Sequence, residues 1–67
     1  MKVEKLQMLR AIITLVFRTQ ADFAAHLGTD QARISEILTG RKALTRAKAE
    51  RWAEALGVPL SEIFEEG

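Results

Sequence analysis

The first quarter of the chain shows the alternation of apolar and polar positions that is typical of an amphipathic helix. Its apolar side chains recur about every third position: Val3, Leu6, Leu9, Ile12, Ile13 and Val16. This spacing predicts a helix from Lys2 to about Phe17. Leu15 and Phe17 lie partly off the stripe, so the helix is expected either to be buried on two sides or to bend at its end.

A second, shorter helix is predicted from Gln20 to Leu27. Thr19 precedes it as a capping residue, and Asp22 follows three positions later, a pair that resembles a capping box. Its inward face carries Phe23, Ala24 and Leu27. Gly28 comes next, where a helix commonly ends in the left-handed conformation that glycine adopts at least cost.

A third helix is predicted from about Gln31 to Thr39. Thr29 and Asp30 both favour the capping position in front of it, and Gly40 is expected to end it. Its inward residues are Ile34, Ile37 and Leu38. The opposite side of this helix is polar.

The last third of the chain predicts two more helices. Thr45 caps a fourth helix, Arg46 to Leu56, which Gly57 ends. Its inward face is expected to carry Ala49, Trp52, Ala53 and Leu56, with Trp52 in the core. Pro59 suits the first turn of a fifth, short helix that carries Leu60, Ile63 and Phe64.

The fold class follows from these five segments. Strict alternation of apolar and polar residues never persists, so no strand is predicted. We expect one all-α domain of five short helices over residues 1–67. A domain of this size buries only ~60% of its unfolded surface, so it cannot enclose both a core and a large ligand.

The composition excludes several classes of site. The chain has no cysteine and a single histidine, His26, so no metal site is expected, and His26 is expected to be exposed and without a role. No catalytic residue, cofactor or phosphate loop is expected, and an enzyme is disfavoured. No apolar run approaches the ~20 residues that span a bilayer, and no signal-peptide pattern is present. We therefore expect a cytoplasmic protein without a membrane partner.

Charge is distributed unevenly along the chain. The net charge is +1, but residues 33–51 contain six basic and two acidic groups, whereas residues 52–67 contain four acidic groups and no basic one. Such asymmetry suits a domain with one face toward a polyanion, although an unevenly charged solvated surface is an equal alternative.

The second and third predicted helices have the spacing of a helix-turn-helix. They are joined by about three residues that include Gly28, and two short helices that meet across such a turn form this motif. In DNA complexes the first of the two helices crosses the backbone and the second lies in the major groove. The polar face of the third helix offers hydrogen-bonding groups, which the reading of base edges requires.

The residues in this region resemble a known family. The stretch "TQADFAAHLGTDQARISEILTGRK" is similar to the Cro/repressor-type (XRE-like) helix-turn-helix, through Gln20, Phe23-Ala24, Leu27-Gly28, Asp30, Ile34, Ile37 and Gly40. The later "AEALGVPLSEIF" resembles the end of the same domain. The resemblance covers about residues 6–64 and implies a five-helix, lambda-repressor-like domain. It also implies double-stranded DNA as the partner and, commonly, a dimer on an inverted repeat.

The resemblance further implies a set of contact residues. Base contacts are expected from Gln31, Ala32, Ser35 and Glu36; Gln31 suits adenine and Glu36 suits the amino group of cytosine. Backbone contacts are expected from Thr19, Gln20, Arg33, Arg41, Lys42 and Arg46, and Arg33 also suits a guanine. Read without the family, Gln31, Ser35 and Glu36 are ordinary helix surface, and Arg33 pairs with Glu36. In the same reading, Arg46, Lys48 and Arg51 only solubilise the fourth helix.

Four positions depart from the family pattern or weaken it. Its frequent Arg–Glu pair between the first and third helices is replaced by Ile13 and Leu38, a swap that can be neutral for stability. The usual glycine between the first two helices is Phe17, so this junction is expected to differ. Asp30 is favourable as a cap but repels a nearby phosphate.

These features predict a sequence-specific DNA-binding regulator, a small bacterial or phage repressor that binds as a homodimer and associates with the nucleoid. Leu60, Ile63 and Phe64 are expected both to close the core and to form the dimer contact. Two alternatives stay open. One is an antitoxin that binds DNA and a toxin, and the other is a helical protein-interaction module without affinity for DNA.

Overall fold

The computed structural model describes residues 3–64, with side chains from Lys5 onward, and it is all-helical over that range. Its five helices are α1 (Val3–Phe17), α2 (Gln20–Leu27), α3 (Gln31–Leu38), α4 (Arg46–Leu56) and α5 (Leu60–Ile63). The predicted all-α class is therefore confirmed. The predicted start at Lys2, the Val3 side chain, and Glu65 and Glu66 lie outside the described residues.

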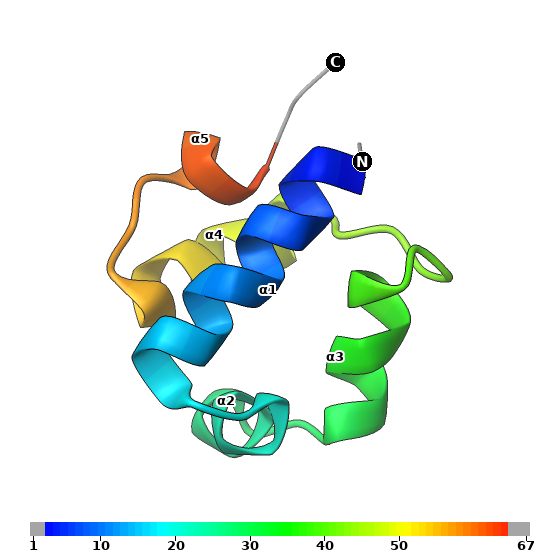
Figure 1. The fold of residues 1–67 in the computed structure, drawn as a ribbon, viewed down its shortest axis with the longest axis vertical. Helices are drawn as coiled ribbons and strands as arrows, with labels where there is room; N and C mark the ends of the chain where they lie inside the picture. The colour runs from blue at the N-terminus through cyan, green and yellow to red at the C-terminus, as the bar shows by residue number, and fades with distance from the viewer. Residues whose placement is uncertain (1–2, 65–67) are drawn as a thin grey trace.

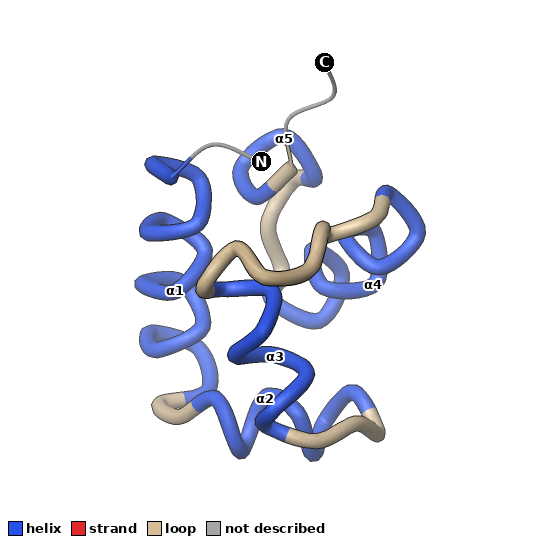
Figure 2. The backbone as a smooth tube through the Cα atoms, turned by 90° about the vertical axis from the view of Figure 1, so that its right-hand side faces the viewer, coloured by secondary structure: helices blue, strands red, loops and turns tan. Residues whose placement is uncertain are grey.

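The helices surround one core. α1 runs along the front of the molecule in Figure 1, α4 lies behind it, and α5 lies beside its N-terminal half. α2 crosses below the end of α1, and α3 stands to one side (Figure 1). Figure 2 shows the loop after α3 running across to α4. Lys5 Nζ ties α1 to α5 by donating to the carbonyl of Ser61 at 2.7 Å.

The core contains the inward faces expected from the sequence. Its largest fully buried side chains come from four helices: Leu9, Ile13, Phe23, Ile34 and Ile63. Trp52 is only 4% exposed, and its ring meets Phe23 edge-on at 5.1 Å, which confirms its place in the core. Ile13 and Leu38 are both buried in this core, so the apolar pair is part of the packing between α1 and α3.

Each of the three middle helices has an N-cap side chain that accepts a backbone N–H of its first turn. Thr19 Oγ1 accepts the N–H of Asp22 at 3.0 Å, and Asp30 Oδ1 accepts the N–H of Arg33 at 2.9 Å. Thr45 caps α4 in the same way. The capping-box expectation was wrong in its second half, because the N–H of Thr19 donates to the carbonyl of Phe17 at 2.8 Å instead of to Asp22.

The junction between α1 and α2 differs from the family pattern at a neighbouring residue. Phe17 stays helical, and Arg18 takes the left-handed conformation with φ 71°. The half-buried Phe17 ring then packs against Phe23 and His26, each at 5.1 Å. His26 is exposed as expected, but it is not without a role, because its ring covers Phe17.

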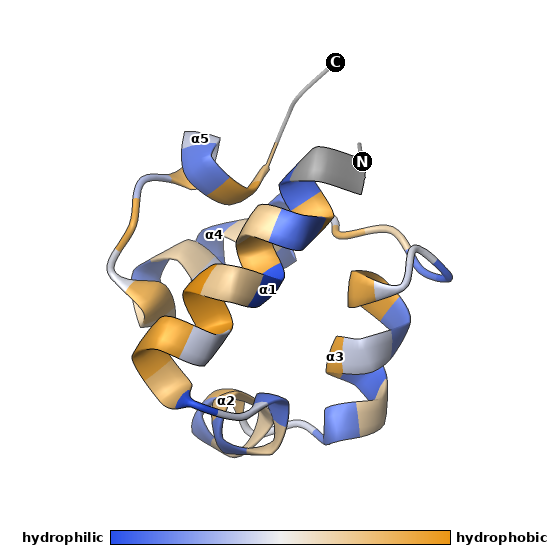
Figure 3. Ribbon diagram, viewed as in Figure 1, coloured by the Kyte–Doolittle hydropathy of each residue, from blue (hydrophilic) through white to orange (hydrophobic). Residues whose placement is uncertain are grey.

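The outer face of α1 carries apolar residues that the protomer does not cover. Leu15 is 84% exposed, Val16 49% and Met8 44%. In the ribbon of Figure 3, the C-terminal half of α1 is coloured mostly as hydrophobic. Of the two alternatives predicted for α1, burial on two sides is therefore wrong for the single chain.

Two helix ends differ slightly from the sequence expectation. α3 ends at Leu38, with Thr39 as its cap and Gly40 following at φ 83°. Pro59 caps α5 from outside, so its first turn begins at Leu60. Both shifts are of one residue, which is the ordinary uncertainty of a helix boundary.

Candidate nucleic-acid interface

The turn between α2 and α3 depends on the backbone conformation of Gly28. Its φ of 76° and ψ of 28° are left-handed, and the N–H of Thr29 donates to the carbonyl of Ala24 at 2.9 Å. A Cβ at Gly28 would meet nothing within 4 Å, so glycine is required here by its φ angle and not by lack of space. The predicted stop between two helices is confirmed: α2 ends at Leu27, just before Gly28, and α3 begins at Gln31.

The expected base-contacting residues share the outer side of α3. Gln31 and Ala32 in its first turn are exposed, and Ser35 and Glu36 one turn later are half-buried. Residues three or four positions apart are neighbours on a helix, so Ala32 adjoins both Ser35 and Glu36, and Gln31 adjoins Ser35. These four side chains therefore form one continuous surface. The opposite side of α3 is buried in the core through Ile34, Ile37 and Leu38.

Two exposed ion pairs lie on this surface. Lys42 Nζ is 3.9 Å from Glu36 Oε2, and Arg33 Nε is 3.8 Å from Asp30 Oδ2. The alternative in which Arg33 pairs with Glu36 was therefore wrong, because Arg33 lies beside Asp30 and Glu36 lies beside Lys42. Exposed pairs at such distances contribute little to stability, so a phosphate can compete for either cation.

The expected backbone-contacting residues fall in two places. Thr19 and Gln20 stand at the start of α2, where the Thr19 hydroxyl accepts the Asp22 N–H and keeps its own proton for a donor role. Arg41 and Lys42 follow α3, and both of their backbone N–H groups donate to the carbonyl of Glu36, at 2.9 and 3.1 Å. The loop therefore folds back onto the end of α3 and keeps both cations beside it.

The remaining cation of this set is engaged in a different contact. Arg46 Nε donates to Glu50 Oε1 at 3.1 Å, one turn along α4. Lys48, on the same helix, lines a surface hollow whose other polar or charged lining residues are Asp30, Arg33, Glu36 and Lys42, next to Ala32. The sequence interpretation assigned Lys48 to solubility alone. Nothing in the local pattern of α4 could have placed it beside α3, because that proximity depends on how the two helices pack.

The residues expected at a dimer contact are buried to different degrees. Ile63 is fully buried, so its side chain has no surface to offer a second copy. Leu60 and Phe64 are half-buried and pack against the core from outside. Leu60 at the start of α5 and Phe64 directly after it thus retain exposed apolar surface, whereas Ile63 does not.

Residues 3–64 contain neither a metal-binding cluster nor a membrane-spanning helix. Among residues 3–64, no group of three or more His, Asp or Glu side chains is arranged to hold a metal ion. Within the same range, the helices are too short and too polar to cross a membrane.

Comparison with known proteins identifies the domain. A family model described as Helix-turn-helix, of the XRE type, matches residues 18–63, which is more than half of the chain. No match to the chain was found among the curated proteins or among the solved structures. The matched family has the lambda-repressor-like fold and comprises DNA-binding transcription regulators. The left-handed turn at Gly28, the exposed polar start of α3 and this match together show that the chain belongs to the XRE-type helix-turn-helix family.

Proposed function

We propose that the chain is a sequence-specific transcriptional repressor that binds an inverted-repeat operator as a homodimer. The observation that carries this proposal is the surface at the start of α3. There Gln31 and Ala32 are exposed beside Ser35 and Glu36, and Arg41 and Lys42 follow the same helix. Groups that read base edges thus lie next to cations that hold the backbone.

The proposed contacts divide into two kinds. Gln31 reads adenine and Glu36 reads cytosine, which confers sequence preference. Thr19, Gln20, Arg33, Arg41, Lys42 and Arg46 hold phosphates, which sets the register on the duplex without sequence information. Thr19 and Gln20 lie at the start of α2, whereas Arg41 and Lys42 lie in the loop after α3. This distribution supports phosphate contacts on both sides of the major groove that α3 would enter.

A dimer is proposed because one copy offers few phosphate contacts. Six contacts bind weakly at physiological salt, whereas two copies double the number and read two half-sites about 34 Å apart. Leu60 and Phe64 are the proposed contact, since they leave apolar surface exposed on α5. Repression then follows from occupying a promoter.

Selection of DNA from a random pool tests the proposal. We expect an enriched motif with two inverted half-sites, and affinity that falls steeply with salt, by a slope of about −0.9 per phosphate held. A Gln31→Ala variant provides the matched control and is expected to lose the preference at one base pair of each half-site. The absence of any enriched motif, together with equal binding to random duplex, would contradict the proposal.

A second candidate, a protein-interaction module such as an antitoxin, is favoured by one observation. Leu15 and Val16 expose apolar surface on α1, away from the start of α3. If Gln31→Ala and Arg41→Ala leave a cellular complex intact and the unaltered chain binds no DNA, this candidate replaces the first. A toxin is supported as the partner if the protein bound in that complex inhibits growth when it is produced without the chain.

A further inference from the structure

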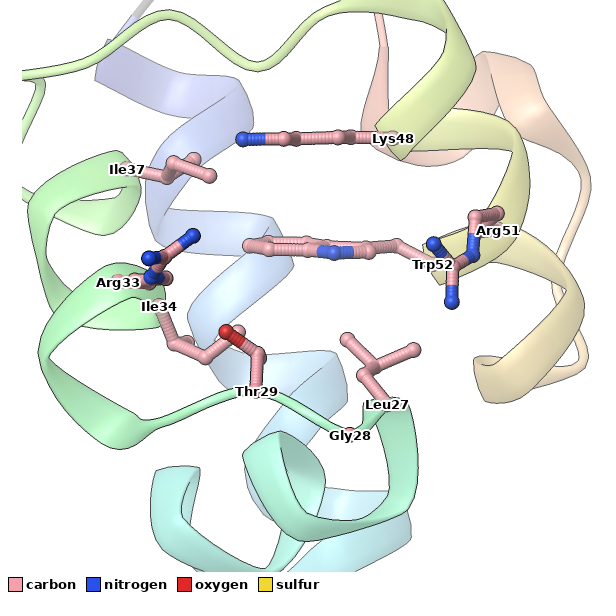
Figure 4. Close-up of a pocket in the computed structure, with 9 residues that line it drawn as sticks. All are labelled: Leu27, Gly28, Thr29, Arg33, Ile34, Ile37, Lys48, Arg51 and Trp52. Atoms are coloured by element: carbon pink, nitrogen blue, oxygen red, sulfur yellow. The ribbon is translucent and has the colours of Figure 1, made fainter.

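A pocket of about 250 Å³ lies between the start of α3, the turn at Gly28 and the outer face of α4 (Figure 4). Three cations line it: Arg33 from α3, and Lys48 and Arg51 from α4. Lys48, Arg51 and Trp52 stand at helical spacing and therefore share one face of α4. We call this space the α3–α4 pocket.

No acidic side chain lines the α3–α4 pocket. Neither Lys48 nor Arg51 has an ion-pair partner among the described residues. Arg33 stands 3.8 Å from Asp30, but Asp30 lies outside the pocket, on the side toward the base-contacting surface. The positive charges around the pocket thus have no internal counter-charge.

The pocket also contains an unused neutral donor. Trp52 is 96% buried, and its indole N–H has no acceptor within the described part of the chain. The nitrogen itself reaches solvent, because no buried side-chain nitrogen in that part of the chain lacks a partner. Figure 4 shows the indole edge-on, with its nitrogen toward the viewer, Lys48 on one side of its plane and Leu27 on the other. An indole N–H that reaches solvent beside the pocket can donate to a ligand there.

Every polar side chain that lines the pocket can donate a hydrogen bond, and three of the donors are cationic. We propose that the α3–α4 pocket binds a phosphoryl group, held by Arg33, Lys48 and Arg51 and by the indole N–H of Trp52. An oxyanion accepts from all of these donors and relieves the repulsion between the cations. The volume suits such a group better than a whole cofactor, which occupies ~300–1,000 Å³.

The phosphoryl group has two possible sources with the same chemistry. Arg33 and Lys48 line both this pocket and the adjacent surface that carries Ala32 and Glu36. A backbone phosphate flanking the half-site therefore lies within the same basic region, and this source rests on the proposed function. The other source is a small phosphorylated molecule free in solution, which does not depend on DNA binding.

Inorganic phosphate is the probe, because Trp52 is the only tryptophan of the chain and reports on the pocket by its fluorescence. We expect a saturable change in Trp52 emission with phosphate, and a higher melting temperature than in sodium chloride of equal ionic strength. In the double variant Lys48→Met, Arg51→Gln, phosphate should bind on the order of tenfold more weakly. Arg10→Gln, which removes an exposed cation of α1 outside the pocket, should bind phosphate as the unaltered chain does.

A second variant keeps the test independent of folding. Trp52→Phe preserves an aromatic ring against Phe23 but removes the N–H, so its gain in melting temperature with phosphate should be smaller than that of the unaltered chain. Each variant is compared with itself in chloride, which separates a loss of stability from a loss of binding.

Measurements of DNA binding by the double variant distinguish the two sources of the phosphoryl group. If phosphate binding is lost and the salt slope of DNA binding falls by about 0.9 for each contact removed, a DNA phosphate occupies the pocket. If phosphate binding is lost while DNA binding is unchanged, the ligand is a free phosphorylated molecule. A phosphate response no larger than that of chloride overturns the proposal, whatever the DNA result. Failure of the unaltered chain to bind DNA overturns the proposed function but leaves the phosphate measurement intact.

Discussion

Lys42 Nζ lies 3.9 Å from Glu36 Oε2, so the cation proposed to hold a phosphate and the carboxylate proposed to read cytosine face each other in the protein without DNA. Both side chains are partly exposed, at 67% and 36%. The pair is therefore weak, and each partner can turn to DNA at small cost. The negative charge of Glu36 consequently repels any DNA phosphate near it, while its carboxylate is proposed to confer a preference for cytosine at one position.

Glu36→Gln tests this double role. Removing the charge frees Lys42 and reduces repulsion, so we expect tighter binding to random duplex. The preference for cytosine at one position should fall by about 1–3 kcal/mol, because the amide no longer offers only acceptors. Titrations with the selected operator and with operators substituted at each position measure both effects. Unchanged preference at every position would remove Glu36 from the base-contacting set.

Asp30→Asn separates capping from charge. Asparagine caps a helix about as well as aspartate, so the free energy of unfolding should change by less than about 0.5 kcal/mol. The loss of a negative charge near the expected phosphate should strengthen DNA binding. Thermal unfolding and salt-dependent titrations check the two parts separately. Weaker DNA binding by a variant of normal stability would show that the carboxylate itself makes a favourable contact.

Arg41→Ala is expected to weaken binding to all sequences by a similar factor. Arg41 is exposed after α3, and its side chain forms no ion pair within residues 3–64. Loss of one phosphate contact should lower the salt slope by about 0.9 without altering the selected motif. Arg10→Ala, on α1, is the control and should leave the slope unchanged. A change of motif in Arg41→Ala would instead place this side chain at a base edge.

Gly28→Ala should destabilise the fold by about 1–2 kcal/mol, because the left-handed φ of 76° is unfavourable for a residue with a Cβ. Steric contact adds nothing to this cost, since no atom lies within 4 Å of the Cβ position. Gly28→Asn, which tolerates this conformation better, should cost less. Denaturant unfolding of both variants gives the comparison. Equal stability of Gly28→Ala and the unaltered chain would mean that the turn relaxes to another conformation.

Two variants that each introduce an aspartate, Phe64→Asp and Leu15→Asp, test which surface forms the proposed dimer. Phe64→Asp removes half-buried apolar surface from α5 and should shift the chain to a monomer with weaker operator binding. Leu15→Asp places the same charge on α1, about ten residues along the helix from the contact between Lys5 and α5. It should leave the oligomeric state unchanged. Sedimentation at several concentrations measures both, and dissociation by Leu15→Asp alone would move the interface to α1.

The sequence alone determined most of the local structure. Helical periodicity, the capping residues Thr19, Asp30 and Thr45, and the glycine at position 28 are local signals, because each acts on backbone within one or two turns. For the same reason the exposed side of α3 was predictable. The reciprocal half of the capping box failed because the Thr19 N–H found the carbonyl of Phe17, a competition between neighbours that residue types do not resolve.

Only the tertiary structure decided which distant side chains meet. The pairing of Glu36 with Lys42, the complete burial of Ile63 and the exposure of Leu15 follow from how the loop and helices pack. The α3–α4 pocket likewise combines Arg33 with Lys48 and Arg51, which are separated by at least 15 positions in the chain. A helix pattern shows which face of each segment is polar, but the packing of whole helices determines which polar faces lie opposite each other.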